Sequence, residues 1–104
     1  LGDVYKRQGD KFSIGGSSHR KKEFTTQTLR MKENDCLYLF SDGYPDQFGG
    51  PIGKKFMTKN IAEMVTKIAH LSMLEQGKIV ESAILEWMKN EEQIDDILMA
   101  GIKF

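Results

Sequence analysis

The chain has 104 residues, 39% hydrophobic and 29% charged, with a formal net charge of zero and one cysteine. This length suits one small domain or part of a larger one, and no stretch reaches the roughly 18 apolar residues of a membrane span. A single cysteine excludes an internal disulfide, and the polar amino end shows no signal-peptide pattern, so a cytoplasmic location is expected.

Charge is divided unevenly along the chain. Residues 1–32 hold eight Lys and Arg against three Asp and Glu, and residues 33–104 hold seven against twelve. The basic part, with Arg20, Lys21 and Lys22, has no interleaved aromatic residues, so no nucleic-acid partner is expected. The acidic remainder suits divalent cations better than polyanions.

The amino-terminal elements are weakly specified. Residues 1–10 are interpreted as an upstream tail or as non-native sequence. A short strand is predicted at 11–14, followed by a Gly-Gly-Ser-Ser turn at 15–18. Residues 22–29 alternate unevenly around β-branched threonines and predict a half-exposed strand, a candidate antiparallel neighbour of the next one.

The strongest signal is D-C-L-Y-L-F-S-D-G-Y-P-D-Q-F-G-G at 35–50. The apolar run at 36–40 predicts a strand buried on both faces. Gly43 supplies permissive backbone for a turn, which places Asp42 at the rim of a sheet. Asp42 is then a candidate metal ligand or catalytic carboxylate, or an ordinary turn residue. A loop follows at 44–55, with Phe48 as its expected anchor.

Two amphipathic helices are predicted next. The first is predicted to be capped by Thr58 or Asn60 and to continue to about Ser72, and the second spans about 75–90. Their short link predicts an antiparallel pair or a bent continuation, packed on a sheet. Their apolar stripes comprise Ile61, Met64, Val65, Ile68, Leu71 or Ser72, and then Val80, Ala83, Ile84, Trp87 and Met88.

The apolar run at 97–102 predicts a second buried strand, directly after Asp95 and Asp96. If it pairs antiparallel with the strand at 36–40, Asp42 and Asp95 converge. Converging carboxylates either share a proton or bind Mg²⁺ or Mn²⁺. The alternative is that Asp42 fixes a turn while Asp95 and Asp96 end a helix, and spacing alone leaves both open.

Several motifs together resemble one family. They are L-Y-L-F-S-D-G-Y-P-D-Q-F-G-G-P-I-G-K-K-F at 37–56, E-Q at 75–76, the Trp87 region, E-Q-I-D-D-I-L at 92–98 and I-G-G at 14–16. From about residue 11 to 104, the chain resembles the carboxy-terminal half of bacterial PPM-type (type 2C) serine/threonine phosphatases, in the branch of stage II sporulation protein E (SpoIIE). The resemblance implies an α+β fold, part of an α-β-β-α sandwich with antiparallel strands and a packed pair of helices.

The resemblance also implies roles for individual residues. Asp42 and Asp95 are the implied ligands of a two-ion Mn²⁺ or Mg²⁺ centre, Asp96 a less direct contributor, and Gly43 the residue that permits the tight turn. Metal-activated water attacks phosphorus directly in this family. The implied partners are a small phosphorylated anti-sigma-factor antagonist and an upstream sensor domain, with no direct membrane contact.

The chain departs from the family in one respect. The family's first half carries another metal-binding Asp, in an Asp-x-x-Gly-His-Gly motif, but neither His19 nor His70 is followed by glycine. The chain by itself is therefore expected to bind metal weakly and turn over little. The alternative is a non-catalytic, phosphatase-like module that binds a phosphoprotein. His19, His70 and Cys36 have no assigned role.

Overall fold

The computed structural model describes residues 5–7 and 23–104 of the chain. The predictions for residues 1–4 and 8–22, which include the strand at 11–14, I-G-G at 14–16, His19 and the basic cluster Arg20, Lys21 and Lys22, lie outside the described residues. The domain boundary predicted at residue 11 stays a prediction.

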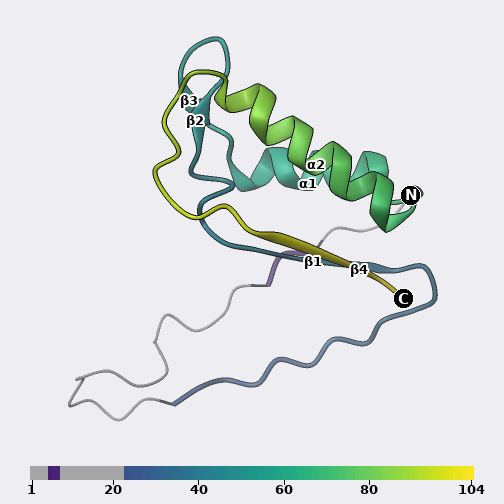
Figure 1. The fold of residues 1–104 in the computed structure, drawn as a ribbon. Coiled ribbons are helices and arrows are strands. Elements are labelled where there is room, and N and C mark those ends of the chain that lie inside the picture. Colours follow the sequence, from purple (N-terminus) through teal and green to yellow (C-terminus); the bar gives the residue numbers. More distant parts are fainter. Residues whose placement is uncertain (1–4, 8–22) are drawn as a thin grey trace.

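The described chain forms an α+β fold, as predicted, with two helices on one side of a strand pair (Figure 1). The helices run in opposite directions above the strands, and a small hairpin lies near the end of the second helix. In chain order the elements are β1 (Cys36–Phe40), β2 (Phe48–Gly49), β3 (Lys54–Lys55), α1 (Thr58–Ile68), α2 (Met73–Met88) and β4 (Met99–Lys103).

Strands β1 and β4 pair antiparallel, with Phe40 opposite Met99 and Cys36 opposite Lys103. The predicted pairing of the two apolar runs is therefore confirmed. The prediction of a strand at 22–29 is wrong for its described part, since residues 23–29 form none. Among the described residues, β4 is the hydrogen-bonded neighbour of β1.

The β1–β4 sheet has one face toward the helices and one open face. On the helix side, the Tyr38 hydroxyl donates to Gln76 Oε1 at 2.6 Å. Side chains alternate along a strand, so Leu39 lies on the opposite face, where it is 57% exposed, and Ile102 in β4 is 45% exposed. The prediction of strands buried on both faces is wrong here, because the helices cover only one face.

The helices differ from the predictions at their ends. Met57 occupies the N-cap position of α1 without a side-chain cap, so neither Thr58 nor Asn60 is the cap. Helix α1 ends at Ile68, and Ser72 instead caps α2, where its side chain accepts a hydrogen bond from the Glu75 N–H at 3.2 Å. This Ser-x-x-Glu pattern begins a separate helix and excludes a bent continuation of α1.

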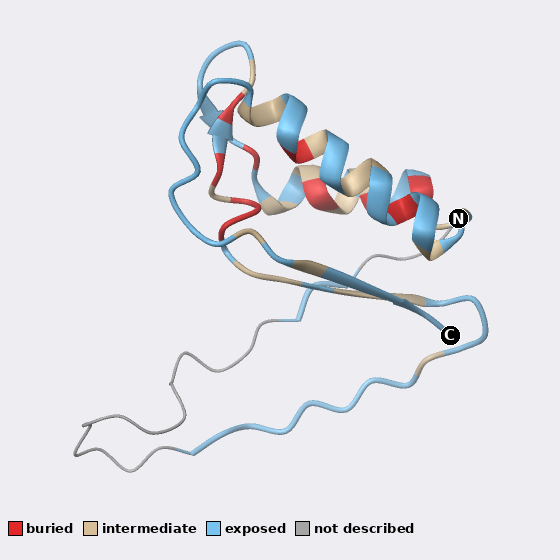
Figure 2. Ribbon diagram, viewed as in Figure 1, coloured by how far each residue is buried: buried red, intermediate tan, exposed pale blue. Residues whose placement is uncertain are grey.

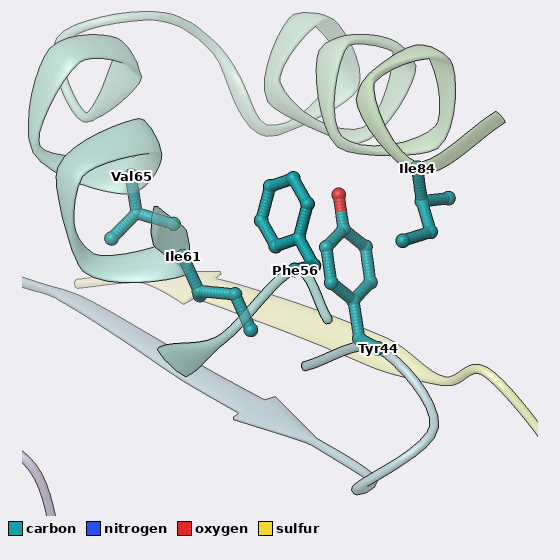
Figure 3. Close-up of a cluster of buried hydrophobic side chains, with 5 residues drawn as sticks. All are labelled: Tyr44, Phe56, Ile61, Val65 and Ile84. Atoms are coloured by element: carbon teal, nitrogen blue, oxygen red, sulfur yellow. The ribbon is translucent and has the colours of Figure 1, made fainter. Parts of the chain in front are cut away.

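The core lies between the helices and the turn after β1. Figure 3 shows its five buried side chains converging from the turn, the segment before α1 and both helices. Figure 2 shows the same gathering of buried residues at the turn and on the inner sides of the helices. The members are Tyr44, Phe56, Ile61, Val65 and Ile84.

Tyr44 anchors the segment that follows β1. It is 1% exposed, its ring meets Phe56 edge to face at 5.2 Å between centroids, and its hydroxyl donates to Val80 O at 2.7 Å. Burial raises the pKa of Tyr44 to about 12. Phe48, the expected anchor, is 39% exposed in the β2–β3 hairpin, so that prediction is wrong.

No helix in the described part of the chain is long and apolar enough to cross a membrane.

Candidate functional site

The candidate site lies where β1 ends and the segment before β4 begins. Beyond Phe40, the Ser41 N–H donates to Leu98 O at 3.0 Å, so the pairing continues past the strand. The Ser41 hydroxyl also donates to Asp96 O at 2.8 Å and accepts from the Leu98 N–H at 3.1 Å. One serine side chain thereby fastens the start of the S-D-G turn to residues 96–98.

Gly43 makes the second contact between these segments. A Cβ at this position would lie 2.0 Å from Asp96 O, closer than real Cβ atoms approach, and 3.2 Å from Ile97 N, which is also a tight contact. Gly43 itself does not have a positive φ. Glycine is therefore needed here for close backbone approach, and not for the permissive turn conformation that we expected from the sequence.

Asp42 thus lies between two residues that both contact the backbone of Asp96. Its own carbonyl accepts from the Asp46 N–H at 2.9 Å, which closes the turn, and its side chain is exposed. The convergence of the S-D-G turn with the Asp-Asp segment agrees with the prediction. The roles of Asp42 and Asp95 as ligands stay predictions.

Asp95 and Asp96 lie in an irregular segment and do not end a helix, since α2 finishes at Met88. Both are exposed to solvent. One carboxylate oxygen of Asp95, Oδ1, accepts a hydrogen bond from the Asp96 N–H at 2.7 Å. This bond orients the Asp95 carboxylate and leaves its other oxygen available as a ligand atom.

The carboxylates match the oxygen preference of Mg²⁺ and Mn²⁺. Among residues 5–7 and 23–104, however, no three His, Cys, Asp or Glu side chains lie together as a metal-holding group. Asp42 and Asp95 therefore fit such a centre in donor type and supply only part of a ligand set. Ligand atoms from beyond the described residues would have to complete it.

Sequence reasoning missed the residues that hold the two segments together. Ser41 and Gln47 both stand in the recognised motif, but no role followed from their type. Gln47 is fully buried, and its side-chain N–H₂ donates to Glu92 O at 2.9 Å. A polar side chain in a glycine-rich loop is normally solvated, so sequence alone gave no signal of this burial.

Comparisons with known proteins point to one class. No family model matches the chain, and no curated protein does. Among solved structures, the SiaA-PP2C domain of Pseudomonas aeruginosa is similar, with a TM-score of 0.65 and 30% sequence identity. The match covers 66% of this chain and 28% of that one, so the chain spans little more than a quarter of its neighbour.

The chain is thus similar to part of a PP2C (PPM-type phosphatase) domain, which confirms the resemblance inferred from its motifs. The two helices and two small antiparallel sheets of the described residues agree with the α+β fold that the resemblance implies. The particular SpoIIE branch, the metal ions and the substrate stay predictions.

Proposed function

We propose that the protein containing this chain is a metal-dependent phosphatase that hydrolyses phosphoserine or phosphothreonine in a protein substrate. One observation carries the proposal: both neighbours of Asp42 contact the Asp96 backbone, within a segment similar to a PP2C domain. Two carboxylate-bearing segments that are far apart in sequence are thus held together at one end of the β1–β4 strand pair.

In this proposal Asp42 and Asp95 would hold Mn²⁺ or Mg²⁺, two ions in the complete centre, and Asp96 contributes less directly. When bound, such ions activate water and neutralise charge on phosphoryl oxygens. The Asp96 N–H keeps the Asp95 carboxylate in one orientation. Ser41 and Gly43 keep the two segments in register, which reduces the reorganisation needed when a metal binds.

The proposed substrate is a small phosphorylated protein of the anti-sigma-factor antagonist type, as the SpoIIE resemblance implies. An upstream sensor domain in the parent chain and a location in the cytoplasm belong to the same proposal. Exposed carboxylates repel a phosphorylated segment unless metal ions bridge them, so substrate binding and metal binding are expected to depend on each other.

The test is Mn²⁺-dependent hydrolysis of p-nitrophenyl phosphate by the full-length protein and its Asp42→Asn and Asp95→Asn variants. We expect each substitution to lower the rate at least about 100-fold, beyond the usual effect of residues that only support ligands. Asp46→Asn is the matched control, because Asp46 lies in the same loop but pairs at the surface with Lys55 at 3.6 Å.

A folded full-length protein that is inert at every Mn²⁺ concentration would contradict the proposal. Tight binding of a phosphopeptide by that inert protein would then favour the phosphoprotein-binding module. Equal loss of activity in Asp46→Asn would show that the loop tolerates no substitution, and the ligand roles would fall.

A further inference from the structure

Gln47 is a fully buried amide that joins the two halves of the candidate site. It stands five residues after Asp42, and its Nε2 group donates to Glu92 O at 2.9 Å, three residues before Asp95. The same group donates to Phe48 O at 3.1 Å. The side chain therefore ties the loop after the S-D-G turn to the segment that carries the Asp-Asp pair.

The backbone of Gln47 is fixed to regular structure. Its carbonyl accepts from the Phe56 N–H at 2.9 Å and from the Trp87 indole N–H at 3.0 Å. Phe56 precedes α1 and belongs to the core, and Trp87 lies in the last turn of α2. The bridge to Glu92 thus starts from a point fixed to the core and to α2, so it can position the irregular segment that contains Glu92.

Stability alone gives a poor reason for glutamine at this position. Its Oε1 atom is buried and has no hydrogen-bond partner among the residues that the structure describes. The other buried glutamine, Gln76, is fully paired: Oε1 accepts from Tyr38, and Nε2 donates to Leu71 O at 2.9 Å. An unpaired buried oxygen costs free energy that an apolar side chain of the same shape avoids.

We propose that Gln47 is a positioning residue for the metal centre, holding the segment from Glu92 to Asp96 where Asp95 can share a cation with Asp42. The inference rests on the proposed function, because it assigns Gln47 to that same site. In this role Gln47 is not a metal ligand. It acts through the Glu92 carbonyl and the short segment that follows it.

The two buried glutamines provide a matched test in the full-length protein. In Gln47→Met and Gln76→Met the amide is replaced by an unbranched apolar chain of similar shape. We expect Gln47→Met to raise the Mn²⁺ dissociation constant, measured by calorimetry, about tenfold. Gln76→Met should leave this constant unchanged but lower the thermal midpoint more, since it strands the Tyr38 hydroxyl and the Leu71 carbonyl.

Hydrogen exchange gives a second readout that does not depend on metal. Amides of residues 93–98 should exchange faster in metal-free Gln47→Met than in metal-free Gln76→Met. If Gln47→Met fails to fold, Gln47→Leu replaces it in both measurements, and failure of both variants to fold overturns the inference in favour of a purely structural role.

The outcomes separate the two proposals. Unchanged Mn²⁺ binding in folded Gln47→Met, or an equal change in Gln76→Met, overturns the positioning role. A wild-type protein that binds Mn²⁺ without hydrolysing phosphoesters contradicts the proposed function, while the same dissociation constants still decide the role of Gln47. A wild-type protein that binds no Mn²⁺ overturns both.

Discussion

The two ends of the β1–β4 sheet are built differently. At one end, near the link between α1 and α2 (the helix end), both polar groups of the Gln76 side chain are paired, with Tyr38, Leu71 and Ala69. At the other end, where the S-D-G turn meets the Asp-Asp segment (the loop end), the buried Oε1 of Gln47 has no partner among the described residues. The carboxylates of Asp42 and Asp95 at this end are exposed. The difference indicates that the helix end is arranged for stability, whereas the loop end accepts a cost in stability to hold two acidic segments together.

Tyr44 connects these two ends, since it follows the S-D-G turn and fills the core. Tyr44→Ala should lower the free energy of unfolding by about 3–5 kcal/mol, the usual cost of truncating a buried aromatic residue. Urea unfolding measures the loss. Phe48→Ala in the same loop is the control and should cost clearly less, because Phe48 is 39% exposed and lies outside the buried cluster. Similar costs for both would contradict the assignment of Tyr44 as the anchor.

Gly43→Ala would break the loop end while leaving the helix end intact. The added Cβ would meet the Asp96 backbone, so the segment must move, at a cost of about 1–3 kcal/mol. Gly77→Ala is the counterpart in α2, where a Cβ would meet nothing within 4 Å, and should stabilise the helix by up to about 1 kcal/mol. Opposite signs in urea unfolding are expected. A harmless Gly43→Ala would mean that the two segments do not touch.

Ser41→Ala should have a smaller effect, about 1 kcal/mol. It removes two hydrogen bonds to Asp96 and Leu98, but both backbone groups are exposed and can turn to water instead. Hydrogen exchange at the Leu98 amide should be faster in Ser41→Ala than in wild type, whereas exchange at Ile102, which pairs with Leu37 inside the ladder, should not change. An unchanged rate at Leu98 would contradict a clamp by Ser41.

The smallest effect under ordinary conditions concerns pH. Burial raises the pKa of Tyr44 from 10 in the unfolded chain to about 12. A raised pKa means that the folded state holds the proton more tightly, so this stabilisation is complete below pH 10 and is lost as pH rises toward 12. Urea unfolding across this range should show a steeper loss for wild type than for Tyr44→Phe, and identical slopes would contradict burial of the phenol.

Much of the fold could be predicted from local pattern. The two apolar runs predicted the β1–β4 pairing, and the apolar stripes predicted both helices, because burial against one partner leaves a periodic trace in the sequence. The open sheet face could not be predicted, since the residues of β1 look the same whether one face or both are covered. The choice of Tyr44 over Phe48 as anchor also depended on a tertiary contact, the Val80 carbonyl.

For the site, the motif predicted which segments meet but not how they are held. Asp42 and Asp95 were predicted as candidate ligands from their places at strand ends and from the resemblance, and these roles stay predictions. Gly43 lies in the predicted turn, but glycine is needed there for close approach to the Asp96 backbone and not for an unusual backbone conformation. Such a close approach leaves no local signature in the sequence. Ser41 and Gln47 act through partners more than 40 residues away, a distance at which spacing in the sequence carries no information.

The most direct test of this account is a calorimetric Mn²⁺ titration of the full-length protein, its Asp42→Asn and Asp95→Asn variants, and the double variant. If both aspartates bind one centre, each single substitution weakens binding strongly and the double substitution adds little further, because the site is already lost. Independent, additive effects, or undiminished binding in either single variant, would contradict a shared centre and return Asp42 to the role of a turn residue.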